Sequence, residues 1–484
     1  MVNWKIISKI LGSLLFIEGS FMGWCLIMAI GYGESDILPF IISMIIIFGG
    51  AFGFRRLGHS DDNMLSRRDA YVVVTITWIV FSLFGMLPFL LSGALPSITD
   101  AFFETMSGFT TTGVTVIKDV ESLPHALLFW RSLMQWIGGL GIVFFTIAIL
   151  PSLVGGSVKV FAAEATGPMR SKMHPKLSTS AKWIWSIYVL LTVVCALSFW
   201  LAGMGWFDAI NYSMSTTATG GFSTHNGSIF LASPLIEYLA ILFQFLAGIN
   251  FTLLYMTFVK FQFRRFLNNS EFKFYVIAII VSTVWIMILL ITRMGYDIEG
   301  AFRSALFQVV SFITTTGLSN TDAGFWPQIT WVILGVLMFI GACAGSTTGG
   351  FKSIRVMMLI NVLRNEFRRI LHPNAVLPVK VNGQNIPQEK LTTLLSFFTI
   401  YIIMMLFICI VMVLSGIDFA NAATISLSLM SNVGAGLDTN IGPVMSWADL
   451  SIGIKWFCSA LMLVGRLEVI AVLVLFTRSF WKEN

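Results

Sequence analysis

Four stretches of the chain share one pattern of hydroxyl and glycine residues. They read DAFFETMSGFTTTGVTV, DAINYSMSTTATGGFST, SALFQVVSFITTTGLSN and NAATISLSLMSNVGAGL. Aligned without gaps, they superimpose one set of glycines and one of serines: Gly113, Gly221, Gly317 and Gly434, and Ser107, Ser215, Ser311 and Ser428. Glycine accepts backbone angles closed to other residues and leaves room for an approaching ion. Because carbonyl rings can replace the hydration shell of an alkali ion, the pattern favours cation coordination by backbone oxygens.

A packing role is the alternative for any single stretch. Ser and Thr hydroxyls can bond back to helix carbonyls, and glycine is common where membrane helices pack closely. The four stretches, however, recur in register at intervals of about 100 residues, which fits a repeated unit of span, re-entrant segment and span. Packing alone gives no reason for this recurrence, so we favour coordination around one shared axis.

The composition identifies a polytopic membrane protein. Of the 484 residues, 56% are hydrophobic and 11% are charged, and the mean hydropathy is +0.85. Apolar runs near the length of about 20 residues that crosses a bilayer predict these spans: 7–30, 38–54, 71–91, 126–150, 184–204, 236–259, 275–291, 328–341, 391–415 and 452–480. The basic residues behind the net charge of +6 gather in short loops, which argues against nucleic-acid binding.

The spans and the four stretches together predict an all-α fold, with an N-terminal hairpin and four helix–pore loop–helix repeats around one central pore. We place the hairpin at 1–70 and the repeats at 71–182, 183–270, 271–390 and 391–484, with an intramembrane loop at 341–353. Irregular backbone is tolerated inside a membrane only where protein buries it or water lines it. The short helix before each glycine would present the negative end of its dipole, which favours a cation.

Other site chemistries find little support in the sequence. The five cysteines, Cys25, Cys195, Cys343, Cys409 and Cys458, are widely spaced in or beside apolar runs, which predicts neither a disulfide framework nor a metal site. The spans hold no paired carboxylates, histidine cluster or nucleophile with a base, so we expect no enzyme and no organic cofactor. The first apolar run lacks a small-residue cleavage site and is expected to remain as a span.

The motifs MSGFTTTGVTV, ATGGFSTHNGS, TTTGLSNTD and SNVGAGLDT, in this order, resemble the Trk/Ktr/HKT superfamily of potassium transporters. The N-terminal hairpin and GACAGSTTGGFKSIR at 341–355 narrow the resemblance to the TrkH type, over essentially the whole chain. The resemblance implies potassium uptake through a carbonyl-lined filter and a homodimer of two pores. It also implies a separate cytoplasmic ring of nucleotide-binding, TrkA-like regulatory subunits.

The resemblance also implies which backbone oxygens bind potassium. They belong to Thr111, Thr112 and Gly113; Thr219, Gly220 and Gly221; Thr315, Thr316 and Gly317; and Asn432, Val433 and Gly434. Asn432 and Val433 depart from the threonine pattern, so the fourth repeat forms the least typical of the four walls of the pore. Superfamily members that favour sodium tend to replace the first filter glycine by serine, and Gly113 therefore indicates potassium over sodium.

Small residues interrupt the second span of the third repeat at 341–350. They neither fill a lipid-facing surface nor favour a helix, so protein must cover this backbone. In TrkH-type proteins such a loop acts as a gate under the filter; an ordinary helix break is the alternative. The implied gate residues are Gly345, Ser346, Thr347, Thr348, Gly349, Gly350, Lys352 and Arg466.

Charged residues within spans are costly and need partners. Arg466 is the sharpest case, because the matching arginine of the family lies below the filter and sets a barrier to cations. The alternative is a buried ion pair with Glu468 or Glu104 that only holds helices together. We interpret Glu104 and Arg131 as mainly structural.

Loop charges predict the orientation of the chain. Lysine and arginine gather on one side, which the positive-inside rule assigns to the cytoplasm of a bacterial inner membrane, with both termini inside and the filter entrances outside. The opposite side, with Glu34, Asp36 and Asp119 among its acidic residues, predicts a vestibule that concentrates cations; simple solvation of short loops is the alternative, and the two are compatible. The basic loops 163–182 and 363–390 are candidate docking sites for the regulatory partner.

Two functions remain open at this point. The first is a gated potassium pathway. The second is a secondary active transporter that couples cation uptake to protons or sodium, which predicts an ionisable mid-span residue and inverted repeats. The four units read as parallel repeats, and few ionisable candidates lie within the spans, so we favour the first.

Overall fold

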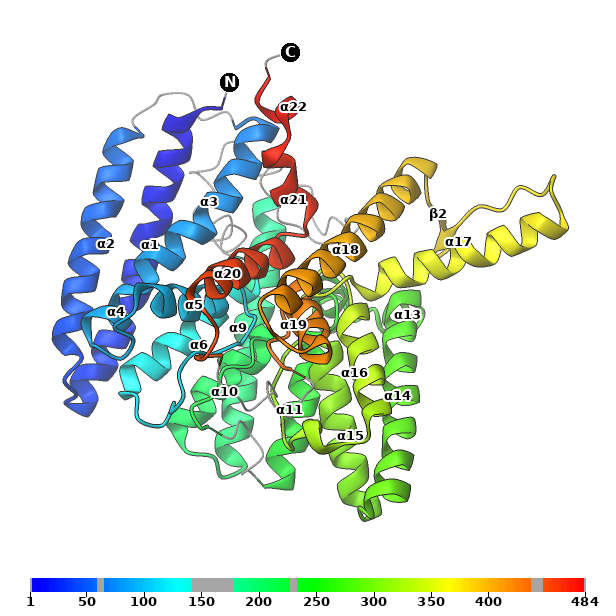
Figure 1. Ribbon diagram of the computed structural model, residues 1–484, viewed down its shortest axis with the longest axis horizontal. Coiled ribbons are helices and arrows are strands. Elements are labelled where there is room, and N and C mark those ends of the chain that lie inside the picture. Colours follow the sequence, from blue (N-terminus) through cyan, green and yellow to red (C-terminus); the bar gives the residue numbers. More distant parts are fainter. Residues whose placement is uncertain (1, 59–64, 142–176, 227–232, 437–446, 483–484) are drawn as a thin grey trace.

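The computed structural model describes residues 2–58, 65–141, 177–226, 233–436 and 447–482, and almost all of its regular structure is helical. The chain opens with a hairpin of α1 (Trp4–Tyr32) and α2 (Ile37–Leu57). The Asn3 side chain accepts the N–H of Ile6 at the start of α1, and Gly33, at φ +67°, ends the helix in a left-handed turn. In Figure 1 the hairpin lies at one side of the molecule, beside α3.

Each repeat consists of a long helix, a short buried helix that we call the pore helix, and a second membrane helix. The first repeat has α3 (Arg67–Gly85), a short α4 (Leu87–Leu91), pore helix α5 (Ile98–Phe109) and α6 (His125–Gly139). The second has α9 (Leu177–Leu201), pore helix α10 (Trp206–Ala218), α11 (Pro234–Ala247) and α12 (Phe251–Phe258), followed by a surface turn, α13 (Phe263–Leu267).

The third and fourth repeats follow the same plan. The third has α14 (Ser270–Met294), pore helix α15 (Ile298–Ile313), the turn η1 (Ala323–Phe325), α16 (Gln328–Ile340) and α17 (Ser353–Leu371). A two-stranded antiparallel sheet, β1 (Lys380–Val381) and β2 (Gln384–Asn385), leads to the fourth. That repeat has α18 (Gln388–Leu414), pore helix α19 (Phe419–Ser431), α20 (Ile452–Arg466), α21 (Ile470–Leu473), η2 (Val474–Phe476) and α22 (Arg478–Trp481).

The repeats close into a ring. The second membrane helix of each repeat packs on the pore helix of the next: α6 on α10, α11 on α15, α16 on α19 and, from the last repeat to the first, α20 on α5. The pore helices therefore lie inside the ring, as Figure 1 shows for α5 and α19 beside α20. The predicted all-α fold with a hairpin and four repeats around one centre is confirmed.

Six described helices are long and apolar enough to cross a bilayer: Trp4–Tyr32, Ile37–Leu57, Arg68–Leu91, Thr179–Leu201, Ser270–Met294 and Gln388–Leu414. Two further predicted spans, 236–259 and 452–480, are bent by 102° and 109°, which their apolar runs did not predict. The first bend follows from Asn250, whose side chain accepts the N–H groups of Thr252 and Leu253 and so starts a new helix. Part of the predicted span 126–150, residues 142–150, lies outside the described residues.

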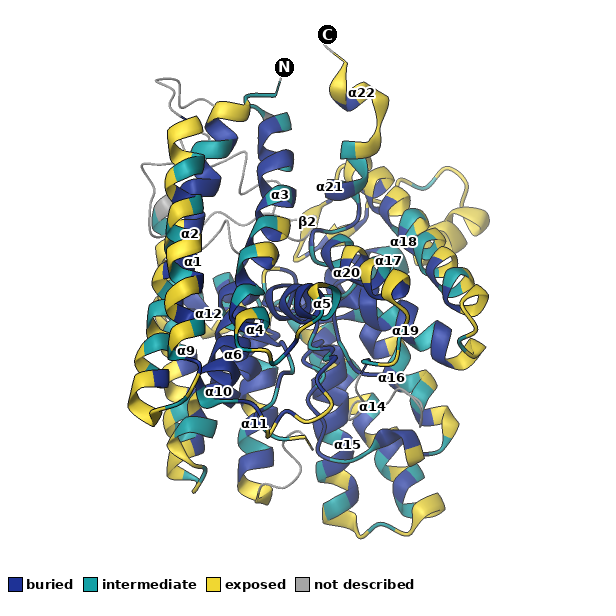
Figure 2. Cartoon of the chain, turned by 60° about the vertical axis from the view of Figure 1, so that its left-hand side comes forward, coloured by how far each residue is buried: buried dark blue, intermediate teal, exposed yellow. Residues whose placement is uncertain are grey.

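The side chains are distributed as expected for a protein in lipid. The outer faces of α2, α9, α14 and α18 expose apolar side chains such as Ile45, Val193, Trp285 and Ile403. Serines and threonines of the pore helices are instead buried at the centre, where Figure 2 shows the buried core. All five cysteines are free; four are buried and Cys409 is partly exposed.

Candidate ion-coordination site

Each pore helix ends at a residue in the left-handed conformation. The four residues are Thr111, Thr219, Thr315 and Asn432, with φ of +53°, +53°, +54° and +52°. Such angles are uncommon for any residue other than glycine and costly for a β-branched one. One backbone turn is therefore built four times, and Asn432 adopts it although its side chain departs from the threonine pattern.

The same hydrogen bond closes every turn. The N–H of the residue after the left-handed one donates to the carbonyl of the serine five positions back: Thr112 to Ser107 (3.0 Å), Gly220 to Ser215 (2.9 Å), Thr316 to Ser311 (2.8 Å) and Val433 to Ser428 (3.0 Å). The serine register found by aligning the four stretches is thus confirmed at the level of the backbone.

The four aligned glycines, Gly113, Gly221, Gly317 and Gly434, lie in contact with the neighbouring repeats. All four have positive φ, between +77° and +84°. Each lies so close to a carbonyl oxygen of the next repeat that a Cβ would overlap it; the pairs are Gly113 with Gly220, Gly221 with Thr316, Gly317 with Val433, and Gly434 with Thr112. The contacts run from repeat one to two, three, four and back to one. Four equivalent carbonyl oxygens therefore surround a common axis.

The electrostatics of this ring suit a cation. All four pore helices end directly at the turns, and each helix C-terminus carries about half a negative charge. The turn residues are themselves buried, so water screens these dipoles little. The arrangement can replace a hydration shell with fixed oxygen dipoles.

A buried ion pair supports the turns of the first two repeats. Glu104 is fully buried, and one of its oxygens accepts Arg131 Nε at 2.9 Å while the other accepts the N–H of Val116 at 2.9 Å. Arg131 also donates to the Ser223 carbonyl at 3.0 Å, and its guanidinium carbon lies 4.1 Å from the centre of the Phe222 ring. The pair therefore ties the segment after Gly113 to the segment after Gly221.

The other repeats use different support. Gln308, at the position equivalent to Glu104, donates to Ser319 Oγ at 2.6 Å and to the Thr321 carbonyl at 2.9 Å. In the fourth repeat the Asn432 side chain donates to Thr112 Oγ1 and to the Met462 carbonyl, both at 2.9 Å. The atypical fourth turn is thus joined directly to the first.

Gln135 on α6 contacts the second turn, and sequence analysis missed it. Its Nε2 donates to the Gly220 carbonyl at 2.8 Å, and its Oε1 accepts the N–H of Phe222 at 3.1 Å. A Cβ on Gly220 would overlap the Gln135 amide, so this glycine is required by its neighbour. The available signal was a glutamine within an apolar run.

The intramembrane loop, residues 341–352, separates α16 from α17 at the break predicted from its small residues. Two side chains missed in the sequence hold its first half: Asn250 donates to the Ala344 carbonyl at 2.6 Å, and Glu271 accepts the Ala344 N–H at 2.6 Å. The Gly345 carbonyl accepts the N–H of Phe251 at 3.0 Å. The break between α11 and α12 therefore forms the seat of the loop.

The tip of the loop touches the turns of the ring. Thr347 Oγ1 donates to the Thr217 carbonyl at 3.1 Å and accepts from Thr219 Oγ1 at 3.4 Å. The Gly349 N–H donates to Thr315 Oγ1 at 2.7 Å. A Cβ on Gly349 would overlap the Ser431 carbonyl. The loop thus contacts repeats two, three and four directly beside their left-handed residues.

The remaining loop residues stabilise its path. Ser346 Oγ lies 2.5 Å from the Cys343 carbonyl and 2.8 Å from Thr348 Oγ1. Lys352 is buried and donates to both oxygens of Thr348. Gly350, at φ +75°, packs on Gly341, where neither residue has room for a side chain.

Arg466 joins this loop to the first repeat. Its guanidinium donates to the Thr347 carbonyl at 3.0 Å and to the carbonyls of Gly138 and Gly139, both at 2.7 Å. The two carboxylates considered as its partners are paired elsewhere: Glu104 with Arg131 at 2.9 Å, and Glu468 with Arg355 at 2.6 Å. Arg466 and the loop together connect all four repeats.

Comparisons with known proteins agree with this architecture. A family model described as TrkH, cation transport protein, matches residues 36–483. The chain is 38% identical over 423 residues to the Trk system potassium uptake protein TrkH of Salmonella typhimurium, covering 87% of each chain. It is 36% identical over 493 residues to the TrkH of Vibrio parahaemolyticus, covering both chains fully.

A solved structure is similar over the same range. The crystal structure of the potassium transporter TrkH from Vibrio parahaemolyticus matches with a TM-score of 0.89 and 34% identity, over 99% of this chain and 100% of that one. The match therefore includes the hairpin and all four repeats.

Proposed function

The chain belongs to the TrkH family of cation transport proteins, which are transporters and not enzymes, and from this premise we propose that it takes up potassium through the ring of backbone carbonyls. The observation that carries the proposal is the closed chain of contacts between each filter glycine and the carbonyl of the next repeat. An ion on that axis exchanges water for four equivalent oxygens at a time. Relatives that share the family are named for potassium uptake, and Gly113 stands where sodium-favouring members of the superfamily tend to carry serine.

The intramembrane loop and Arg466 form the gate in this proposal. The loop lies against the left-handed residues of the proposed filter. Arg466 binds the tip of the loop, and its positive charge there repels a cation that passes the filter. Displacing the tip breaks a small set of hydrogen bonds and leaves the backbone of the filter in place. A regulatory cytoplasmic partner of the TrkA type would shift the balance between the loop in contact with the filter and the loop with its tip displaced.

Membrane orientation and assembly are part of the same proposal. Both termini lie on one side in Figure 1, which the basic loops assign to the cytoplasm of a bacterial inner membrane. The homodimer and the regulatory ring follow from the family resemblance. Of the two candidate docking loops, residues 163–176 lie outside the described residues, and the segment 363–390 includes the end of α17 and the small sheet.

A coupled transporter is the second candidate, and Glu18 is the observation that favours it. This residue of α1 is fully buried, and neither carboxylate oxygen has a hydrogen-bond partner among the described residues. An ionisable group within a span is by default a functional candidate. Glu18 lies beside Gly85, where a Cβ would come within 3.1 Å of its Oε1. It therefore lies where the hairpin packs on the first repeat, near Thr105 and Phe109 of pore helix α5.

Ion flux in proteoliposomes that contain this chain alone tests both candidates. Potassium flux that follows its own gradient, without a proton or sodium gradient, supports the gated pathway. Flux that requires a proton gradient and is lost in Glu18→Gln supports coupling and contradicts the first proposal. A variant of an exposed carboxylate on α17, Glu366→Gln, serves as the matched control.

A further inference from the structure

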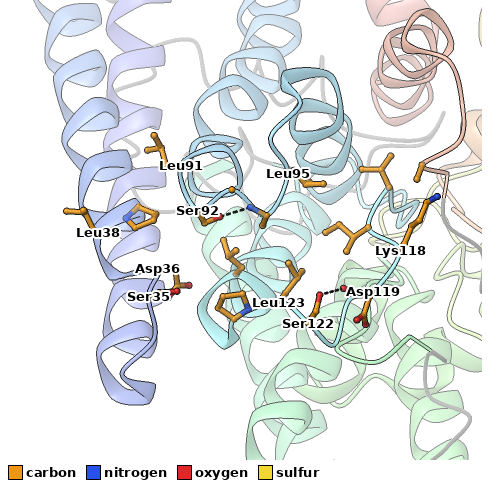
Figure 3. A pocket seen from close by; sticks show the side chains of 18 residues that line it. Ser35, Asp36, Leu38, Leu91, Ser92, Leu95, Lys118, Asp119, Ser122 and Leu123 are labelled. Carbon is orange, nitrogen blue, oxygen red and sulfur yellow. Dashed lines mark hydrogen bonds between the residues drawn. The ribbon is translucent and has the colours of Figure 1, made fainter.

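A cavity of about 780 Å³ lies outside the ring, between the N-terminal hairpin and the first repeat. It is lined mainly by the start of α2, the connection from α4 to α5, and the segment from the first turn into the start of α6, with Ala448 of the fourth repeat at one edge. Figure 3 shows Ser35 and Asp36 on the hairpin side, with Ser122 and Asp119 on the side of the first repeat. Asp36 and Asp119, which line it, were predicted to belong to an acidic vestibule, but Asp36 is buried and the proposed ion pathway does not pass through this cavity.

Asp36 is the unusual residue of the cavity. Only 1% of its surface is exposed, and neither carboxylate oxygen has a hydrogen-bond partner in the described part of the chain. Burial, and then the nearby charge of Glu34, raise the pKa of Asp36. A buried carboxylate is stable as an anion only when a cation or several N–H donors satisfy it. The residue is therefore incomplete without such a group.

The neighbouring charges do not supply that group. Glu34 accepts from His125 at 2.6 Å, and the His125 ring stacks on Tyr32 at 4.0 Å, so the nearest histidine is engaged with another carboxylate. Lys118 also lines the cavity, but its ammonium lies 2.8 Å from Asp449. The nearest cations are thus already paired.

The rest of the lining indicates the shape and chemistry of a ligand. Serine hydroxyls of Ser35, Ser92 and Ser122 lie among apolar side chains, chiefly Leu95, Leu123 and Leu127. A hard metal ion needs six or more converging oxygens, and the described residues contain no group of three or more His, Cys, Asp or Glu that could hold a metal. An ammonium group on an apolar body fits both the single carboxylate and the leucine walls.

The rim of the cavity indicates from which side a ligand can enter. Leu38 is 62% exposed and Leu91 42% exposed, and both border the cavity from helices whose outer faces are apolar. This side of the cavity therefore continues into surface that lipid covers. The opposite rim carries the charged residues Lys118 and Asp119. The ammonium can come from a free amine in water or from the headgroup of an aminophospholipid.

We propose that this cavity binds a primary ammonium group attached to an apolar body, with Asp36 as its counter-ion and the serine hydroxyls around it. The bound cation would link the α1–α2 hairpin to the segment that follows the first filter turn. Binding would therefore stabilise the outer side of the first repeat without entering the ion pathway.

Binding is tested with the full chain in detergent, by thermal unfolding and by mass spectrometry of the intact protein with bound lipid. The probes are phosphatidylethanolamine and hexylamine, with phosphatidylglycerol and hexanol as matched probes that lack the ammonium. We expect at least one of the two ammonium probes, phosphatidylethanolamine or hexylamine, to raise the unfolding temperature of the wild-type chain. A charge-assisted hydrogen bond corresponds to about ten- to a hundredfold in affinity, and Asp36→Asn should lose that factor.

Asp36→Asn is nearly isosteric and removes an unpaired buried charge, so the variant should fold; its unfolding transition without probe checks this. Glu121→Gln, an exposed carboxylate outside the cavity, should bind like the wild type. Stabilisation by phosphatidylethanolamine alone identifies the lipid as the source, and stabilisation by hexylamine identifies a free amine as sufficient. Equal binding to Asp36→Asn, equal effects of probes without ammonium, or no effect of any probe overturns the proposal.

Discussion

The ring of turns that we propose as the filter and the intramembrane loop that we propose as its gate are built in opposite ways. The filter has four copies of one backbone turn, and three threonines and one asparagine adopt the same left-handed angles within it. The loop exists once, in the third repeat, and side chains from other repeats hold it, among them Asn250 and Arg466. Backbone geometry thus makes the symmetric part, and particular side-chain contacts make the asymmetric part. Coordination needs symmetry, whereas a gate needs one element that can move alone.

The largest expected effect is that of a side chain at a filter glycine. In Gly113→Ser the Cβ overlaps the Gly220 carbonyl at φ +82°, so the ring must open at one contact. Strain of about 1–3 kcal/mol corresponds to roughly ten- to a hundredfold loss of preference for potassium over sodium. Potassium and sodium fluxes in proteoliposomes measure it.

Gly53→Ser is the matched control for this substitution, because nothing lies within 4 Å of a Cβ there and the residue belongs to the regular helix α2. It should leave selectivity unchanged. An unchanged ratio in Gly113→Ser would remove the filter assignment and with it the contrast between backbone and side-chain construction.

The next effect concerns the ion pair behind the filter. Arg131→Met leaves Glu104 buried without its cation, and a broken buried pair costs about 3–5 kcal/mol. We expect a clear fall in the unfolding temperature in detergent. Lys118→Met removes the exposed pair with Asp449 and should change little. Equal changes in the unfolding temperature of the two variants would show that the first two turns keep their conformation without this ion pair.

The loop should respond to a single side chain. Arg466→Gln removes the charge and weakens the bonds to Thr347, Gly138 and Gly139. Bonds to a charged donor are worth about 1.5–3 kcal/mol, so the basal potassium flux should rise about tenfold while selectivity stays as in the wild type.

Arg466→Lys separates two roles of this residue, because it keeps the charge and loses the planar fork. Flux as low as in the wild type assigns the barrier to charge, and flux as high as in Arg466→Gln assigns it to the anchored loop. If both variants conduct like the wild type, Arg466 has no part in gating. Arg293→Gln, an exposed arginine at the end of α14, is the control.

The smallest effect is expected at the atypical turn. Asn432→Thr restores the residue of the other repeats but loses the bonds to Thr112 and Met462. Loss of these two neutral bonds, together with a β-branched residue at a left-handed φ, should cost about 1–3 kcal/mol of stability and leave selectivity nearly unchanged. The measurements are thermal unfolding and the potassium-to-sodium flux ratio. A large loss of selectivity here would mean that side chains, and not the backbone alone, define the ring.

Sequence analysis was most successful where structure depends on short stretches. The four glycine-bearing segments and their shared serine register were found by alignment, because the closing hydrogen bond spans only five residues and the glycine angle is a local requirement. The break at 341–350 was found for the same reason. Gln135, Asn250 and Glu271 were missed, because their partners lie far away in the sequence and nothing in their own surroundings identifies those partners.

The sequence by itself determined the membrane class, the hairpin with four repeats and the shared register of the serines and glycines in the four stretches, since apolar length and local backbone preference act over a few residues. Only the tertiary structure decided that each of the four aligned glycines meets the carbonyl of the following repeat, that Arg466 bonds to Thr347 and two glycine carbonyls, and that neither oxygen of the buried Asp36 carboxylate has a hydrogen-bond partner among the described residues. The contacts of the glycines and of Arg466 depend on the packing of segments that lie about a hundred residues or more apart in the sequence. That packing sets which polar groups meet and which are left unsatisfied.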